Sequence, residues 1–275
     1  FAQGPFMYHD LFLRTTYQDS GLVEQSAIRD IPYTVASTNF SSTNPDSRTA
    51  PGDLDYVQGK WIASVIPSGL WNPIVLPTQG FFLYDPDSVD KVVRIVQEMP
   101  YAEGGFFFNS ATYFVRTKAF FAQFTEILYV QDKNNGEVFA VMSLIKRAGF
   151  NRYPYVANIM IVHGDGRYEM LTTAQAEEDP RLSEIALKPE WLMAMEVRAY
   201  GNRYGALKGL FSRLGRIDIQ SSTVNTENKP PYHMETPYGN FWYTPFSPRG
   251  SESLIGIAMS SSHDIDGPVL IWQLP

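Results

Sequence analysis

The chain has 275 residues, of which 44% are hydrophobic, so it is long enough and apolar enough to bury a core, and this excludes a disordered chain. Its formal net charge of −7 predicts a surface that repels nucleic acid and anionic lipid, except where basic residues cluster locally. We therefore expect no nucleic-acid partner.

Cysteine is absent, which excludes disulfides, thiolate nucleophiles and cysteine-ligated metal centres. No apolar run approaches the roughly 18 to 20 residues that span a bilayer, so we expect a soluble chain without a transmembrane segment. The sequence begins with Phe1 and not with Met, which suggests a processed or trimmed form. We give a slight preference to a secreted or periplasmic location.

The content of 18 Phe, 16 Tyr and 5 Trp favours aromatic-rich β-sheets over a helical bundle. Turn-forming residues dominate the first part of the chain, and we expect an irregular N-terminal arm and loop over residues 1–56. The remaining residues, 57–275, are expected to form a single β-rich domain.

Strand patterns begin at residue 57, with short strands expected over 57–66, 74–76 and 80–84. A helix is predicted over about 87–99. Acidic residues and a serine lie at its start, valines recur along one face, and Pro100 stops it.

Residues 106–115 are aromatic and β-branched and predict a further strand. Successive hairpins are then expected. They comprise 127–130 with 138–145 across a turn containing Asn135-Gly136, then 155–162 with 167–171, and finally 254–259 with 269–274. Hairpins in sequence imply antiparallel pairing, so we predict an α+β, β-dominated fold with a sandwich or barrel-like sheet arrangement.

The longest helical pattern covers about 189–214. Its large apolar residues share one broad arc, which should face a sheet. Gly201, Gly205 and Gly209 recur every four residues on the opposite side, where each costs roughly 1 kcal/mol relative to Ala. We therefore predict that this strip contacts a partner or ligand. The predicted contact residues are Arg198, Gly201, Arg203, Gly205, Lys208, Gly209 and Arg213.

Metal chemistry is an alternative. His163 and Asp165 are two residues apart, and together with the distant His233 they have the composition of a facial triad that holds Fe(II). The segment Gly164-Asp165-Gly166 is also a competent hairpin turn by itself, which explains Asp165 without a metal. Under the leading interpretation we predict no cofactor.

No complete catalytic motif occurs, so the leading hypothesis is a non-enzymatic binding or structural protein. Its aromatic-rich antiparallel scaffold would hold a small molecule or a neighbouring subunit, with homo- or hetero-oligomers formed through the N-terminal arm or the glycine strip. The first alternative is a β-barrel mononuclear non-haem iron oxygenase using His163, Asp165 and His233. The second is a soluble sensor or ectodomain of a membrane protein.

Overall fold

The computed structural model describes most of the chain. The described residues are 15–17, 33–43, 49–69, 71–85, 92–120, 122–124, 126–148, 153–201, 217–219, 230–236, 238–248 and 253–273. They form two compact units, each made of more than one chain segment. Unit 1 consists of Phe1–Ile28, Arg147–Val156 and Ile185–Pro275, and unit 2 consists of Arg29–Lys146 and Ala157–Glu184.

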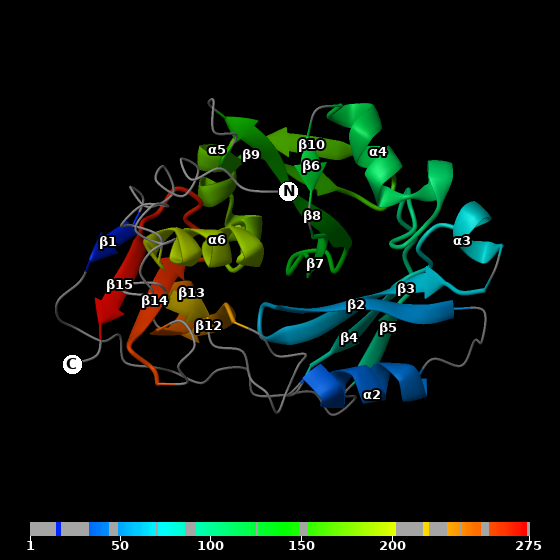
Figure 1. Ribbon diagram of the computed structural model, residues 1–275. Helices are drawn as coiled ribbons and strands as arrows, with labels where there is room; N and C mark the ends of the chain where they lie inside the picture. The colour runs from blue at the N-terminus through cyan, green and yellow to red at the C-terminus, as the bar shows by residue number, and fades with distance from the viewer. Residues whose placement is uncertain are drawn as a thin grey trace. The chain divides into compact units, whose positions relative to one another are not determined.

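The first sheet of unit 2 has four antiparallel strands in the order β2-β3-β4-β5 (Figure 1). The strands are β2 Thr49–Val57, β3 Lys60–Pro67, β4 Phe81–Tyr84 and β5 Val92–Ile95. Helix α2 (Tyr33–Thr43) covers one face of this sheet, because its buried Phe40 stacks on Phe82 with 5.6 Å between ring centroids.

The second sheet has the order β10-β9-β8-β6, with β7 also paired to β8. It is built from β6 Gln123–Phe124, β7 Leu128–Gln131, β8 Val138–Ala148, β9 Tyr153–Val162 and β10 Tyr168–Leu171. The helical elements of unit 2 that follow or precede these strands are α3 Asn72–Val75, η1 Phe107–Asn109, α4 Ala111–Lys118, α5 Thr173–Glu178 and η2 Pro180–Leu182. Both predicted hairpins, β7–β8 and β9–β10, are confirmed.

Unit 1 contains a six-stranded sheet of order β1-β15-β14-β13-β11, with β12 paired to β13. Its strands are β1 Thr15–Tyr17, β11 Ile217–Ile219, β12 Tyr232–Thr236, β13 Gly239–Pro248, β14 Gly256–Ser261 and β15 Val269–Gln273. The β14–β15 pairing confirms the predicted terminal hairpin, and β1 joins β15 in parallel.

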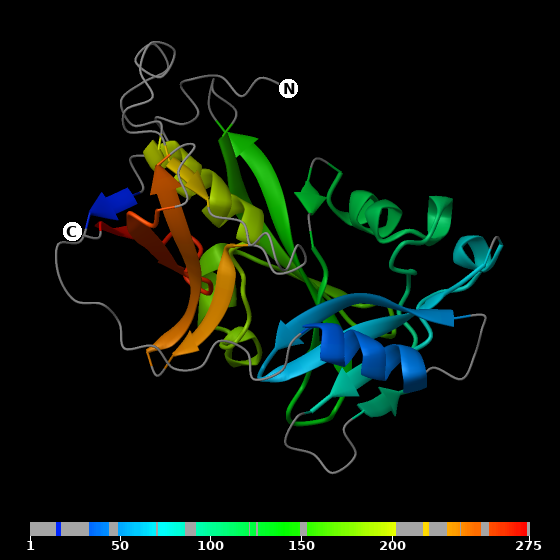
Figure 2. The ribbon, with the colours of Figure 1, turned by 60° about the horizontal axis from the view of Figure 1, so that its bottom comes forward.

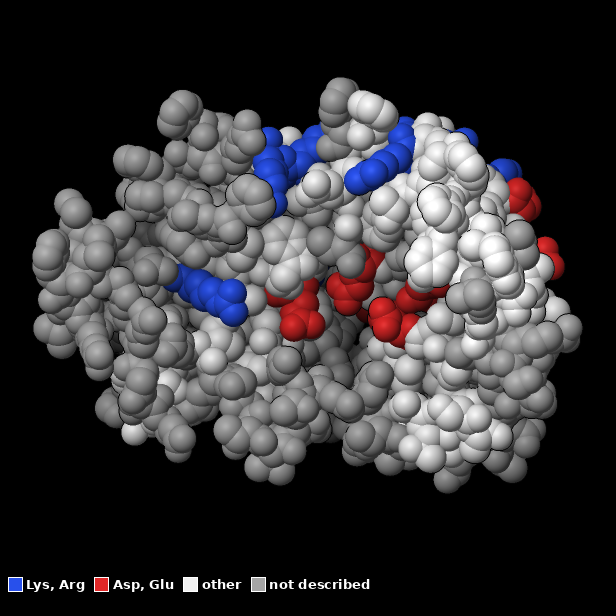
Figure 3. Space-filling view, turned by 45° about the vertical axis from the view of Figure 1, so that its right-hand side comes forward, with Lys and Arg blue, Asp and Glu red and all other residues white. Residues whose placement is uncertain are grey.

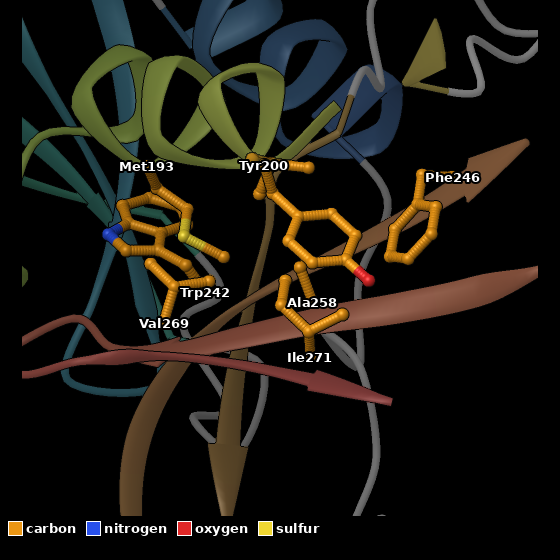
Figure 4. Close-up of a cluster of buried hydrophobic side chains, with 8 residues drawn as sticks. Met193, Tyr200, Trp242, Phe246, Ala258, Val269 and Ile271 are labelled. Atoms are coloured by element: carbon orange, nitrogen blue, oxygen red, sulfur yellow. The ribbon is translucent and has the colours of Figure 1, made fainter. Parts of the chain in front are cut away.

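Helix α6 (Glu190–Gly201) packs against this sheet and organises the core of unit 1 (Figure 2). Met193 and Tyr200 point from the helix toward Trp242, Phe246 and Ile271 of the strands (Figure 4). The opposite side of α6 is also covered, since Met195 and Ala199 are buried beside Tyr153 and Trp191 in a second cluster. The helix is therefore buried on two sides, and Arg198 is its one residue classed as exposed.

The β-dominated α+β class is confirmed by the three sheets, which are antiparallel apart from the β1–β15 pair. The irregular arm predicted over 1–56 is wrong for residues 33–43, which form α2, and for 49–56, which belong to β2. Ala36 and Phe40 of α2 are buried against the four-stranded sheet, and β2 pairs with β3 and packs Leu54 and Tyr56 on the same cluster. This tertiary packing overrides the turn-like composition of the segment. The domain expected over 57–275 corresponds to segments of both units.

The helix predicted over 87–99 is also wrong where it is described, because Val92–Ile95 form strand β5, paired to β4, and residues 96–99 are not helical. β-branched residues are favoured in strands, but the spacing of valines along the sequence cannot show that β4 has a free edge with which this segment can pair.

The strand predicted over 106–115 is also wrong, because these residues form η1 and most of α4. Helix α4 begins after Ser110, whose side chain accepts a hydrogen bond from the Tyr113 N–H. Residues 72–75 form α3 and not the expected short strand. Among the described residues, no helix combines the length and apolarity that crossing a membrane requires.

Candidate functional site

Unit 2 contains a cavity of about 460 Å³ between the middle of β2, the segment 103–105, the start of α4 and residues 124–127. Its lining residues are Asp53, Leu54, Asp55, Glu103, Gly104, Gly105, Ser110, Ala111, Thr112, Phe124, Glu126 and Ile127. We call this cavity the acidic pocket, because four of the described lining side chains carry carboxylates and none of the described lining residues is Lys, Arg or His. In the space-filling view, acidic side chains gather around a hollow on one face (Figure 3).

A β-bulge in β2 forms one wall of the acidic pocket. Pro51 pairs with Val65 and Leu54 pairs with Ala63, so two residues of β2 lie opposite one residue of β3. A bulge bends its strand and changes the direction of the side chains around it. Asp53 lies within the bulge and Asp55 lies two residues later, so both carboxylates reach the pocket.

Glu103 is held at the inner wall by groups that are distant in the sequence. The Asp53 N–H donates to Glu103 Oε1 at 3.4 Å, and the Ser64 hydroxyl donates a short hydrogen bond to Glu103 Oε2. The Glu103 N–H donates to Thr78 Oγ1 at 3.3 Å. Gly52 permits this arrangement, because a Cβ at that position would meet Ser64 Oγ and would lie 2.7 Å from Glu103 Oε2.

The environment of Glu103 favours its neutral form. Burial raises the pKa of this carboxyl above its usual range, and the charge of Asp53 raises it further, while the Ser64 hydrogen bond lowers it. A neighbouring positive charge would offset the desolvation of Glu103 and lower its pKa. The pocket therefore becomes electrostatically more favourable when a cation enters it.

Two tyrosines lie behind Glu103. Tyr101 and Tyr129 are fully buried, and burial and the nearby Glu103 charge both raise the pKa of each phenol. Each hydroxyl influences the pKa of the other, and Tyr129 lowers the pKa of Glu103. Neither tyrosine is among the residues that line the acidic pocket, so both influence it through Glu103.

The rest of the lining is apolar and small. Leu54, Ile127 and Ala111 offer aliphatic surface, and Phe124 offers a half-buried ring. An aromatic ring attracts a cation over its face. The arrangement can therefore bind a small cation with hydrogen-bond donors on one side and hydrocarbon on the other.

A second cavity in unit 2, of about 310 Å³, differs in charge. Lys60 and Lys133 line it together with Asp132. Both lysines already pair with carboxylates, Lys60 with Asp85 at 2.9 Å and Lys133 with Glu184 at 2.7 Å. Its mixed charge gives no preference for a cation or an anion.

The glycine strip is described only at its beginning. Arg198 is exposed on α6, and Gly201 is buried against Ile217 of β11, where an added Cβ would lie 2.5 Å from Ile217 Cγ1. Gly201 therefore packs against a strand of its own unit, and the predicted contact of the strip with a partner or ligand stays a prediction. The other predicted contact residues lie outside the described residues; they are Arg203, Gly205, Lys208, Gly209 and Arg213. The same holds for residues 1–14 of the N-terminal arm.

The three residues of the iron hypothesis each have protein partners. His163 Nε2 lies 2.9 Å from Glu169 Oε1, and His163 Nδ1 lies 3.4 Å from Glu137 Oε1. Asp165 accepts from the Arg167 N–H at 3.0 Å and from its guanidinium at 2.5 Å, as expected for a turn residue.

His233 belongs to unit 1, where its Nε2 lies 3.2 Å from Ser262 Oγ. Within the described parts of the chain, no group of three or more His, Asp and Glu side chains is arranged to hold a metal ion.

The acidic pocket was not predicted from the sequence. Its one local signal is Asp53-Leu54-Asp55, since residues two apart in a strand share a face. Glu103 is 50 residues from Asp53, and no local pattern connects them. No protein-family model matches the chain, and no curated protein is detectably similar to it in sequence.

Proposed function

We propose that the protein is a non-enzymatic binding protein whose acidic pocket holds a small organic cation with a primary ammonium group. The observation that carries this proposal is the group of four carboxylates, Asp53, Asp55, Glu103 and Glu126, around a cavity that no basic residue lines among those the structure describes. Like charges confined to one cavity repel each other, and a bound cation relieves this repulsion.

An ammonium group suits the cavity better than a bare metal ion. It supplies three hydrogen-bond donors, and charge-assisted hydrogen bonds to carboxylates are the strong ones. The aliphatic surface of Leu54 and Ile127 and the ring of Phe124 would contact the hydrocarbon part of such a molecule. Mg²⁺ and Ca²⁺ instead prefer several oxygen ligands in regular geometry, and the described residues contain no such group.

The proposed binding function is consistent with two settings expected from the sequence. In a secreted or periplasmic protein, the pocket would collect or carry the amine. In the ectodomain of a membrane sensor, the same amine would be the signal. The chemistry of the pocket is the same in both settings.

The test is isothermal titration calorimetry of the purified protein with a series of primary amines, such as butylamine and 1,4-diaminobutane. Tetramethylammonium, which has charge but no N–H donor, and CaCl₂ complete the set. We expect primary amines to bind and tetramethylammonium to bind more weakly. Glu103→Gln and Asp53→Asn should each weaken the affinity by about ten- to a hundred-fold, since a hydrogen bond to a charged group contributes about 1.5–3 kcal/mol.

The matched control is Glu178→Gln, which removes an exposed carboxylate of α5 outside the pocket lining. It should leave the affinity unchanged. Equal affinity in Glu103→Gln, Asp53→Asn and the wild type would contradict the proposal, as would the absence of heat with every amine. Binding of Ca²⁺ that the amines do not displace would assign the pocket to an inorganic cation.

A further inference from the structure

A group of exposed aromatic side chains borders the acidic pocket. Residues 104–105 and 110–112 line the pocket, and Phe106–Phe108 lie between these two segments in the chain. The three phenylalanines are 56%, 74% and 79% exposed. Tyr113 is 43% exposed and meets Phe108 edge to face, with 5.1 Å between ring centroids. We call these four residues the aromatic rim. Single exposed apolar residues are ordinary, whereas a contiguous group of large ones indicates an interaction site.

The loop that carries Phe106–Phe108 is short and closed, which keeps the aromatic rim close to the pocket. Consecutive Cα atoms are about 3.8 Å apart, so each of these three Cα atoms lies within about 8 Å of the Cα atom of a lining residue. The Gly105 N–H donates to the Ala102 carbonyl at 2.9 Å, and the Ala102 N–H donates to the Asn109 carbonyl at 2.8 Å. A Cβ added at Gly105 would lie 2.6 Å from Asn109 O, so the loop closes this tightly only with glycine there.

The backbone of the loop is held in a strained conformation. Phe107 has φ of +51°, in the left-handed region that a bulky residue rarely adopts. The Ser110 hydroxyl donates to the Phe107 carbonyl at 2.9 Å, and the Phe106 N–H donates to the Pro73 carbonyl at 3.1 Å. A strained conformation that its surroundings maintain is typical of functional positions. The loop therefore presents apolar rings to solvent at the edge of a charged cavity.

The charges beside the aromatic rim favour a cationic ligand. Four carboxylates line the pocket that the rim borders. The basic residues of α4, Arg116 and Lys118, are in its last turn, and neither lines the pocket. Lys118 Nζ lies over the rings of Phe114 and Tyr168, at 5.9 and 5.2 Å from their centroids. A molecule that contacts both the pocket and the rim therefore needs a positive head and an apolar tail.

We propose that the ligand of the acidic pocket is an amphiphilic primary amine, whose ammonium group binds the carboxylates and whose alkyl tail lies on the aromatic rim. This inference rests on the proposed amine-binding function and specifies the class of amine. Leu54, Ala111 and Ile127 supply apolar surface inside the pocket, and the rim continues it outside. The cavity of about 460 Å³ is toward the lower end of the roughly 300–1,000 Å³ that is typical of ligand sites, so a long tail extends beyond it.

The test is isothermal titration calorimetry of the purified full chain with butylamine, hexylamine and octylamine, each kept below the concentration at which it forms micelles. The affinity of the wild type should rise about two- to fourfold with each added methylene group, because the tail removes apolar surface of the rim from water. Octanoate has a similar tail and a negative head, and it should not bind because the carboxylates repel it.

Two variants separate the tail from the head. Phe107→Ser/Phe108→Ser should bind butylamine like the wild type and bind octylamine at least about tenfold more weakly. Glu103→Gln should weaken all three amines by the same factor, because it changes only the site of the ammonium group. The matched control is Tyr238→Ser, which removes a ring of unit 1 that is 77% exposed, and it should leave the whole series unchanged. Thermal unfolding of the double variant and of the control should match the wild type, since both change exposed positions.

The series distinguishes failure of this inference from failure of the proposed function. A wild type that binds octylamine no more tightly than butylamine overturns the inference and leaves the proposed function standing, whereas a wild type that binds no amine overturns both. An equal gain with chain length in Phe107→Ser/Phe108→Ser and the wild type would place the tail elsewhere and overturn the inference.

Two other occupants of the aromatic rim are also outcomes of the test. Wild-type dimers that the double variant dissociates, with no gain from chain length, would make the rim a contact between two copies of the chain. Polylysine that binds more tightly than octylamine and depends on the same two rings would assign the site to a basic segment of a partner protein. Either result overturns the inference.

Discussion

Lys188 and Glu196 form an ion pair inside unit 1, with 2.7 Å between Nζ and Oε2 and side chains that are 0% and 1% exposed. Lys188 Nζ also donates to Ser260 Oγ at 2.9 Å and to the Gly267 carbonyl at 3.3 Å. The ammonium group therefore contacts three oxygen atoms, and it joins α6 to β14 and to the loop before β15.

We predict that Lys188→Met destabilises the protein by about 3–5 kcal/mol, because it leaves the buried Glu196 carboxylate without its positive charge. The double variant Lys188→Met/Glu196→Met should recover most of this loss, since neither charge is then buried. Urea unfolding measures both effects. The control is Lys133→Met in the exposed pair with Glu184, which should cost less than about 1 kcal/mol. Equal losses in the single and double variants would show that the ion pair is not the cause.

Gly201 is expected to require its lack of a side chain. In Gly201→Ala the new Cβ meets Ile217, and such overpacking costs about 1–3 kcal/mol, whereas alanine gains only about 1 kcal/mol in helix propensity. We predict net destabilisation in the wild-type background. In an Ile217→Ala background the same change should become stabilising, which the free energies of a double-mutant cycle measure. Destabilisation of equal size in both backgrounds would contradict a contact with Ile217.

Arg181 is predicted to stabilise the protein at neutral pH through two carboxylates. Its guanidinium donates to Glu169 and Asp179; it lowers the pKa of Glu169 to about 2 and holds the pKa of Asp179 below its usual range. Both folded-state pKa values are depressed, so the stabilisation is present above the unfolded-state pKa values and is lost as the pH falls toward 2.

The variant Arg181→Met should therefore lose stability at pH 7 and show a flatter decrease of unfolding free energy between about pH 5 and 2. Arg94→Met, which removes an exposed arginine of β5, is the control and should keep the wild-type pH dependence. A wild-type slope in Arg181→Met would contradict the assignment of these shifts to Arg181.

Amine binding should depend on the ionisation of Glu103. Burial raises the pKa of this carboxyl, so we expect the affinity of the wild type to fall with decreasing pH before ordinary carboxyl groups titrate. Glu103→Gln should bind more weakly, and its affinity should stay constant until a lower pH because only the remaining carboxylates titrate. Titration calorimetry over a pH series measures both curves. Parallel curves would show that Glu103 does not contact the amine.

The hairpins were predictable because their information is local. Asn135-Gly136 lies in the turn between β7 and β8, where Gly136 has φ of +74° and its N–H donates to the Asp132 carbonyl. The segment 164–166 forms the next turn in the same way, with the Gly166 N–H donating to His163 O at 3.0 Å. Each turn depends on a few consecutive residues, so neighbouring residues suffice to predict it.

Elements that depend on distant partners were mispredicted. Val92–Ile95 have a spacing compatible with a helix, but pairing with β4 makes them a strand. Phe106–Phe108 have strand-like composition, yet the hydrogen bonds to Pro73 and the cap at Ser110 place them at the start of a helical segment. In both cases a partner outside the local window decides the conformation.

The sequence by itself determined the antiparallel, β-dominated class, the turns, and the described part, 190–201, of the helix predicted over about 189–214, because periodicity and turn chemistry act over a few residues. Residues 202–214 of that predicted helix lie outside the described residues. Only the tertiary structure decided where the acidic residues meet. Asp53 and Glu103 are 50 residues apart, and they converge because a bulge in β2 and the hydrogen bonds of Ser64 and Thr78 bring two strands and a loop to one cavity. Such convergence follows from long-range pairing, which leaves no periodic pattern in the chain.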